Sequence, residues 1–329
     1  MTLQINVAPP DLRHVREILP HELRQLGDQV DEVLLVMDVN RNRLGDPAVW
    51  RDGAVGLREF AESLRGRYPH LRLIDVDSSP ETAAKVAQEF SGGKRMPQKD
   101  WRGAPIYPYF FGVWAARNNY VFHMDSDMLY GGGSQTWVRE AVELMRSGPD
   151  VLFCSPLPGP PTASGELLTQ TLPREPLDTL AFRADQVSTR VFMIDRRRFK
   201  ERVGAIDVVA PARDKVWLAR LDGYQPFQCA EVLLSSALVQ NRLARIDFLG
   251  QDPGLWSLHP PYRSELFYDM LPNLISRIES GDVADGQRGD FDLNDSMVDW
   301  SSARKPRWRR MLRHGELALR NLVPGGRRP

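Results

Sequence analysis

The sequence contains little cysteine and no apolar run long enough to cross a membrane. Its 329 residues include only two cysteines, Cys154 and Cys229, and each lies within an apolar stretch. Two such cysteines form neither a disulfide framework nor a metal cluster, so we expect small buried side chains. No stretch approaches the 18 or so consecutive apolar residues of a transmembrane helix. The N-terminus also lacks the basic and apolar regions of a signal peptide, which predicts a cytoplasmic protein.

Three glycine-rich or serine-centred motifs are missing as well. No G-x-G-x-x-G follows the first apolar segment, which speaks against a dinucleotide-binding fold. No G-x-x-x-x-G-K-[ST] is present, which excludes a P-loop, and the absence of G-x-S-x-G excludes an α/β-hydrolase.

Charge is balanced over the whole chain but not along it. The formal net charge is zero, yet residues 303–329 contain nine Lys or Arg residues and one acid, Glu316, a net charge of +8. Trp308 and Leu312 are interleaved with these basic residues. We predict peripheral contact of this tail with an anionic membrane, and no nucleic-acid partner. The alternative is a solvated basic terminus.

Short apolar segments alternate with segments of helical periodicity. This order predicts an α/β fold in which helices flank a mostly parallel sheet. We expect residues 1–270 to form one domain, and residues 271–329 to form an acidic linker and the basic tail. The expected strands are 3–7, 33–38, 71–77, one that begins at 120, 151–154, 189–194 and 245–249. The expected helices are 12–26, 56–64, 80–90, 108–117, 135–145 and 230–243, and residues 256–261 are expected to form a rigid turn.

The strand that begins at residue 120 ends in two acids, Asp125 and Asp127, with Ser126 between them. Residues two apart on a strand share a face, so both carboxylates can converge on one point. Carboxylates that close repel each other unless a cation neutralises them. Mg²⁺ is commonly held by one or two carboxylates together with substrate phosphates. The pattern therefore predicts a metal-bound phosphate at the carboxyl end of a strand, where open α/β sheets bind ligands. A pair of solvated turn residues is the alternative.

Other loops carry candidate binding residues. Asp38 and Asp77 also end expected strands, and residues 91–103 form a basic loop that includes Lys99. Residues 156–176 contain six prolines, which suggests a lid or binding loop, or else a mobile insertion.

These strand-end acids resemble those of the GT-A glycosyltransferases, most nearly family 2, over about residues 5–268. Residues 5–9 (INVAP) resemble the opening strand, and residues 115–127 (AARNNYVFHMDSD) resemble the approach to the D-x-D motif. The resemblance implies a GT-A-like (Rossmann-like) sheet. It also implies that Pro9, Asp38, Lys99 and Asp125 bind a nucleotide-diphosphate sugar.

The same resemblance implies the roles of further residues. Asp125 and Asp127 would bind Mn²⁺ or Mg²⁺, and His259 resembles a late histidine that some of these enzymes use as a ligand. Residues 229–234 (CAEVLL) match the family's acidic pair, but Ala230 replaces its first acid, which leaves Glu231 as the catalytic base. The expected activity is inverting sugar transfer to the hydroxyl of an unidentified glycan, lipid or small molecule.

Several alternatives stay open. The alternative for Glu231 is a first-turn acid favoured by the helix dipole, in which case Asp222 and Asp252 are the next candidates for the base. The alternative for His259 is a turn residue. A sugar nucleotidyltransferase would need a Gly-rich loop after the first strand, and residues 8–11 (APPD) are not one. A non-catalytic protein that binds a nucleotide sugar or a partner is the third possibility.

Overall fold

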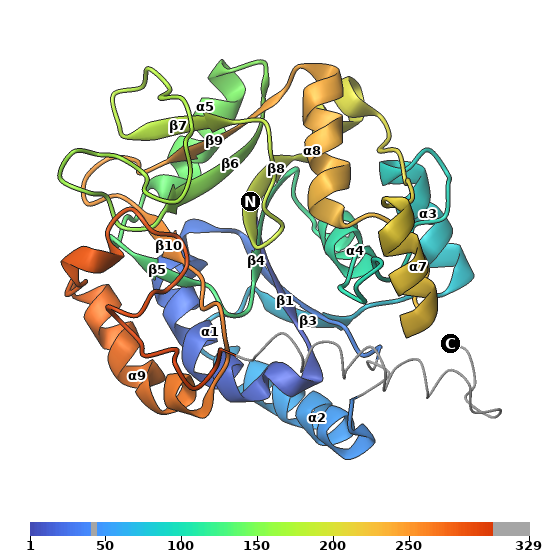
Figure 1. Ribbon diagram of the computed structural model, residues 1–329, viewed down its shortest axis with the longest axis horizontal. Helices are drawn as coiled ribbons and strands as arrows, with labels where there is room; N and C mark the ends of the chain where they lie inside the picture. Colours follow the sequence, from blue (N-terminus) through green and yellow to red (C-terminus); the bar gives the residue numbers. More distant parts are fainter. Residues whose placement is uncertain (41–44, 305–329) are drawn as a thin grey trace.

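The computed structural model describes residues 1–40 and 45–304. The predicted basic tail, from residue 305 onward, lies outside these residues. Within them the strands form one mixed sheet, and helices cover both of its faces (Figure 1). No helix of this described part is both long and apolar enough to cross a membrane.

The strands of the described residues join in the order β3-β2-β1-β4-β8-β6-β10-β5, with β9 between β6 and β7. The first half, β3 to β4, is parallel throughout. Beyond it β8 runs antiparallel to both β4 and β6, whereas β9 and β10 run parallel to β6. The strands are β1 (Thr2–Val7), β2 (Glu32–Met37), β3 (Leu71–Asp75), β4 (Tyr120–Asp125), β5 (Leu129–Gly131), β6 (Val151–Pro158), β7 (Ala181–Ala184), β8 (Val191–Asp195), β9 (Ala244–Phe248) and β10 (Trp256–Leu258).

Local signals explain where several helices begin. The Asp46 side chain accepts a hydrogen bond from the Ala48 amide at the start of α2, and Ser79 caps α3 in the same way. A proline follows each of these caps, where its missing N–H costs nothing. The helices are α1 (Leu12–Leu26), α2 (Pro47–Leu64), α3 (Pro80–Phe90), α4 (Tyr107–Ala115), α5 (Trp137–Ser147), α6 (Arg196–Arg198), α7 (Arg213–Asp222), α8 (Ala230–Asn241) and α9 (Glu265–Glu279).

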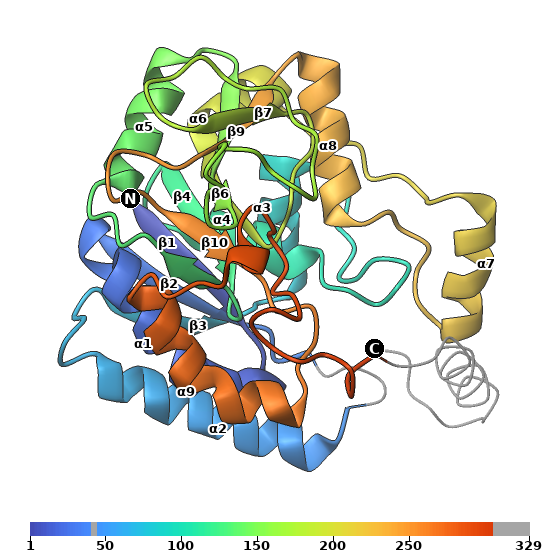
Figure 2. The same cartoon turned by 60° about the vertical axis from the view of Figure 1, so that its left-hand side comes forward.

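Helices lie on both faces of the sheet, as Figure 2 shows, and an apolar core lies beneath the helices of each face. Helices α1, α2 and α5 pack on one face, and α3, α4 and α8 pack on the other. Strand β2 is buried along its whole length, as expected of a strand covered on both faces. The predicted α/β fold with a mostly parallel sheet is confirmed, although the antiparallel strand β8 divides the sheet.

The structure corrects the predicted boundary at residue 270. Helix α9 runs through that position, and Leu271 belongs to a third apolar core together with Ile18 of α1. Val298 and Trp300, from the segment predicted to be a linker, are buried in the same core. The linker prediction failed because scattered apolar residues in an acidic stretch give no periodicity. In the folded protein these residues pack against apolar residues of other elements.

Two further predictions about local structure were wrong. The expected turn at residues 256–261 begins with β10, which pairs with both β5 and β6. The segment predicted as a loop from residue 156 starts with the last three residues of β6. Pairing with distant strands, rather than the local sequence, decides both the short strand β10 and the proline-containing end of β6.

Candidate functional site

Acidic side chains meet at the carboxyl edge of the parallel strands. Asp125 ends β4, and Asp38 follows β2, where its amide donates to the Val7 carbonyl (2.9 Å). Both β2 and β4 pair with β1 in parallel, so their carboxyl ends lie at the same edge. The structure therefore brings the predicted residues Asp38, Asp125 and Asp127 to one place on the molecule.

Asp127 is buried in this edge and Asp125 is half-buried, and their acidity differs. Burial raises the pKa of Asp125 well above its usual range, and the charge of Asp127 adds to this effect. Burial would raise the pKa of Asp127 too, but the opposing charges of Arg263 and His259 hold it below the ordinary value. Asp127 is thus the more acidic member of the pair.

Arg263 is the cation that already neutralises Asp127. Its guanidinium donates two hydrogen bonds to Asp127 Oδ2, from Nη2 at 2.5 Å and from Nε at 3.2 Å. Its Nη1 also reaches Asp11 Oδ1 at 3.3 Å. Sequence reasoning missed Arg263 because an isolated arginine between β10 and α9 carries no motif.

His259 lies beside Asp127, as the metal hypothesis requires. Its Nε2 is 3.9 Å from Asp127 Oδ2, and its Nδ1 is 2.8 Å from Asp292 Oδ1. Arg190 Nη1 lies 3.0 Å from the same Nδ1, so this nitrogen faces a guanidinium as well as a carboxylate. Nε2 is the ring nitrogen on the Asp127 side.

The carboxylate oxygens of Asp125 and Asp127 suit a hard divalent cation, but these two side chains do not complete its coordination shell. Asp127 Oδ1 is buried and has no hydrogen-bond partner among the described residues, so one carboxylate oxygen is left for a ligand. In the same residues no three His, Cys, Asp or Glu side chains converge closely enough to hold a metal. Two carboxylates that need further ligands are the arrangement in which Mg²⁺ relies on substrate phosphates.

Glu231 belongs to the same neighbourhood. It lies in the first turn of α8, is partly exposed, and accepts a hydrogen bond from Thr189 Oγ1 (2.8 Å). The half-buried Tyr109 of α4 lies near both Glu231 and the acids, and its hydroxyl donates to Asp125 Oδ1 (3.3 Å). Burial raises the pKa of Tyr109 well above its usual range, and the charges of Asp125 and Glu231 both add to this shift. Tyr109 therefore stays protonated as a donor to Asp125.

Of the remaining predicted binding residues, Asp38 and Lys99 interact with each other, whereas Pro9 packs against α2. Lys99 acts electrostatically on Asp38, whose pKa is raised by burial and lowered again by this lysine and by the Asn40 amide. The two residues therefore lie within charge range of each other. Pro9 is buried beside α2, and its carbonyl oxygen is so close to Gly53 that any Cβ there would collide with it. The structure thus gives Pro9 a packing role.

The chain is similar in structure to several glycosyltransferases. A TarS fragment from S. aureus in complex with UDP-GlcNAc matches with a TM-score of 0.39 and 12% identity, over 78% of this chain and 57% of the TarS chain. GalNAc-T7 with UDP, GalNAc and Mn²⁺ matches with a TM-score of 0.47 and 13% identity, over 92% of this chain and 52% of the other. The galactosyltransferase LgtC in complex with donor and acceptor sugar analogues matches with a TM-score of 0.36 and 11% identity, over 99% and 98%.

No protein-family model matches the chain, and no curated protein matches it. The chain spans little more than half the length of the TarS fragment and of GalNAc-T7. At these identities, and with TM-scores below 0.5, the likenesses establish neither a family nor an activity, so a function has to be inferred from the side chains of the site.

Proposed function

We propose that this chain transfers a sugar from a nucleotide-diphosphate donor to an acceptor hydroxyl. The observation that carries the proposal is the Asp125–Asp127 pair at the carboxyl edge of β4, with Asp38 at the same edge and Lys99 within charge range of Asp38. This arrangement supplies carboxylates for a cation and a lysine for phosphate charge in one place. It also agrees with the D-x-D resemblance of residues 115–127.

Asp125 and Asp127, together with substrate phosphates, would hold a divalent cation, Mn²⁺ or Mg²⁺, with His259 as a further candidate ligand beside Asp127. When bound, such a cation stabilises the negative charge that develops on a leaving diphosphate. Arg263 would contribute to the same end, because its guanidinium fits phosphate oxygens as well as carboxylates. Asp38 and Lys99 lie further along the edge and would orient the nucleotide.

Glu231 would act as the general base. It would take the proton of the acceptor hydroxyl as that oxygen attacks the anomeric carbon, and the reaction would invert the configuration there. Two groups hold the Glu231 carboxylate in place. The Thr189 hydroxyl donates to it, and Arg102 Nη2 lies 3.9 Å from Glu231 Oε2. The partial exposure of Glu231 leaves room for an acceptor to approach it.

Calorimetry with UDP tests the donor and metal parts of this proposal. UDP is the first nucleotide to try because it is bound in the TarS and GalNAc-T7 structures. We expect Mn²⁺ to increase the affinity for UDP at least about tenfold, and Asp127→Asn to remove this increase. Asp52→Asn, at an exposed position of α2, is the matched control. Equal affinity with and without Mn²⁺ in the parent protein would show that the metal role is wrong.

Nucleotide-sugar binding without transfer is the competing function. Two observations favour it: Ala230 replaces the first acid of the family's acidic pair, and Arg263 already forms an ion pair with Asp127. Slow hydrolysis of UDP-GlcNAc in the presence of Mn²⁺, even without an acceptor, would support transfer. Tight binding without any hydrolysis, over a range of donor sugars, would support the binding function.

A further inference from the structure

Helix α7 lies at one side of the molecule, away from the central sheet (Figure 2). Only Ala219 and Asp222 of its ten residues are buried. Trp217 is 68% exposed, more than any other large apolar side chain of the described residues, and Leu221 is 44% exposed. Side chains four residues apart on a helix lie on the same face, so α7 presents an apolar stripe to the solvent. An exposed apolar patch with polar neighbours is typical of an interaction surface.

Basic side chains border this apolar stripe. Arg213 lies four residues before Trp217 and Arg220 lies three residues after it, so both share its face. Both arginines are exposed, and neither forms an ion pair with a carboxylate of the described residues. Asp214 is the one exposed acid of α7. The outward face of the helix therefore combines an apolar centre with a net positive charge.

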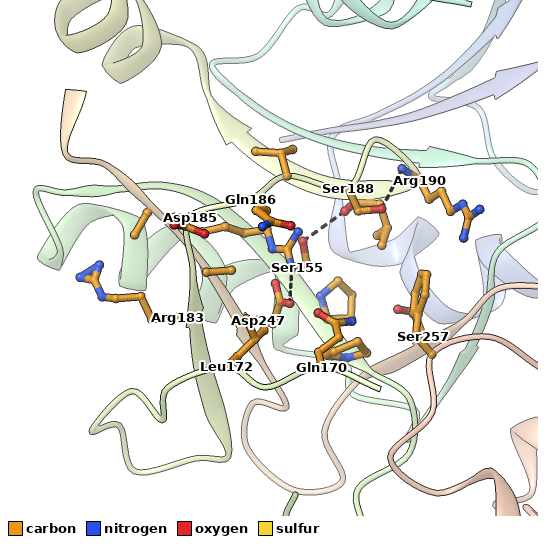
Figure 3. Close-up of a pocket in the computed structure, with 18 of the residues that line it drawn as sticks. Ser155, Gln170, Leu172, Arg183, Asp185, Gln186, Ser188, Arg190, Asp247 and Ser257 are labelled. Carbon is orange, nitrogen blue, oxygen red and sulfur yellow. Dashed lines mark hydrogen bonds and ion pairs between the residues drawn. The ribbon is translucent and has the colours of Figure 1, made fainter. Parts of the chain in front are cut away.

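The cavity shown in Figure 3 offers no comparable cations. It has a volume of about 780 Å³, and each arginine among the described residues that line it has a carboxylate partner. The pairs are Arg183 with Asp150, Arg190 with Asp292, and Arg245 with Asp247. Positive charge that an outside partner could neutralise is therefore found at α7 and not in this cavity.

The basic loop of residues 91–103 lies beside α7 and extends its positive charge. Lys215 Nζ of α7 is 5.2 Å from the centre of the Trp101 ring, and Lys94 reaches Asp207, which precedes the helix, at 3.4 Å. Residues 91–103 contain four Lys or Arg residues and one Asp, a net charge of +3. The surface formed by α7 and this loop therefore suits an anionic partner.

We infer that α7 docks on the surface of an anionic lipid bilayer. Trp217 and Leu221 enter the boundary between headgroups and acyl chains, while Arg213 and Arg220 lie beside the lipid phosphates. Tryptophan favours this boundary because its ring is apolar and its N–H is polar, and anionic headgroups attract the arginines. This inference does not depend on the proposed transfer reaction.

Two other occupants of the α7 surface are disfavoured by charge. The basic tail, residues 303–329, has a net charge of +8, and a second copy of α7 would bring its own arginines. Either would place like charges together. One short helix binds a bilayer only weakly, and stable attachment takes two signals. Helix α7 therefore strengthens the contact predicted for the basic tail and does not replace it.

Fluorescence of the full chain with vesicles tests this inference. The vesicles contain phosphatidylcholine and phosphatidylglycerol, with brominated acyl chains as quenchers. We expect the bromines to quench Trp217, measured as the difference between the parent protein and Trp217→Ala. Trp217→Ala should also lower the affinity for the vesicles at least about threefold. Leu168→Ala, at a position that is 63% exposed, is the matched control and should keep the parental affinity.

A second pair of variants tests the role of charge. Arg213→Gln combined with Arg220→Gln should lower the affinity for these vesicles at least about fivefold. Arg139→Gln removes an exposed arginine from α5 and should have no such effect. Vesicles of phosphatidylcholine alone should bind the parent and the double variant equally weakly.

Three outcomes would overturn the inference. The first is equal quenching in the parent and in Trp217→Ala. The second is parental affinity of both α7 variants for the anionic vesicles, which would leave the basic tail as the whole contact. The third is self-association of the parent in sedimentation velocity that Trp217→Ala abolishes, which would make α7 an interface between copies. Because all these substitutions are at exposed positions, a loss of affinity does not reflect loss of the fold.

Discussion

At the scale of single residues, Glu22 has the most unusual environment. It is completely buried on α1, and neither carboxyl oxygen has a hydrogen-bond partner among the described residues. Burial raises the pKa of Glu22 well above its ordinary value, and the charges of Asp127 and Asp125 add to the rise. The folded protein therefore holds this proton more tightly than the unfolded chain does.

This environment predicts how stability depends on pH. The contribution of Glu22 to the free energy of unfolding is fully present below its ordinary pKa of 4.5 and is lost as pH rises through the higher folded pKa. We expect Glu22→Gln to flatten the fall of stability as pH rises above the ordinary pKa of 4.5, measured by urea unfolding. Glu17→Gln, at an exposed position of the same helix, should follow the parent. A decline equally steep in Glu22→Gln would contradict the prediction.

Glu231 carries the prediction about catalysis. Glu231→Gln keeps the shape of the side chain and the acceptor for Thr189 but removes the basicity. We expect kcat to fall by about 10²–10⁴-fold, with nearly parental binding of UDP and Mn²⁺. Glu81→Gln changes an exposed glutamate in the first turn of α3 and serves as the control. If Glu231→Gln turned over at a near-parental rate, Glu231 would be only a helix acid.

The sequence pointed to individual site residues where the signal lay in neighbouring residues of the chain. Asp125 and Asp127 stand out because two acids end an apolar strand, and Asp38 likewise follows the apolar strand β2. Arg263 and Tyr109 complete their environment from positions 136 and 16 residues away, respectively. Contacts of this kind depend on the fold, so the sequence around either residue carries no signal for them.

At the scale of elements, local capping signals and continuous apolar runs were informative. Helix α3 was predicted with its observed bounds because Ser79 and Pro80 mark its start. Strand β2 was found through its apolar run. Strand β7, and the position of β10 between β5 and β6, were not predicted, since pairing with distant strands decides them. The prolines of residues 156–176 did mark a segment that lines a cavity.

The segment after α9 can be tested as part of the core. Trp300 is 1% exposed, packs against Phe267 (5.8 Å between ring centroids) and donates from Nε1 to the Leu293 carbonyl (2.7 Å). Trp300→Ala should lower the free energy of unfolding by about 3–5 kcal/mol, measured in urea.

Trp217→Ala is the matched control, because Trp217 of α7 is 68% exposed. Its change should stay within about 0.5 kcal/mol. Equal effects of the two substitutions would mean that residues 280–300 attach only loosely to the rest of the protein.

At the scale of the whole molecule, the mixed sheet brings the predicted site together from distant parts of the chain. The acids come from the parallel half, while Arg263 and His259 come from segments at the end of the described chain. The class of fold followed from the alternation of strands and helices. The antiparallel insertion of β8 did not, because its sequence is as apolar as that of a parallel strand.

The basic tail, outside the described residues from 305 onward, carries the prediction about membranes. The full chain should sediment with vesicles of anionic lipid, and salt should weaken this binding as it screens the +8 charge of residues 303–329. Deletion of residues 303–329 should abolish the sedimentation. Neutral vesicles provide the control. If the full chain failed to sediment even at low salt, peripheral membrane contact would be excluded.

The pairing of Arg263 with Asp127 makes the arginine a tethered competitor of any metal ion. A side chain fixed next to its partner acts at a high effective concentration, so a free cation displaces it only at a cost in affinity. A diphosphate would lower that cost, because it offers the released guanidinium new oxygens to bind. Metal and nucleotide should therefore bind synergistically, each weak alone and strong together, and by thermodynamic reciprocity the factor must be the same in both directions.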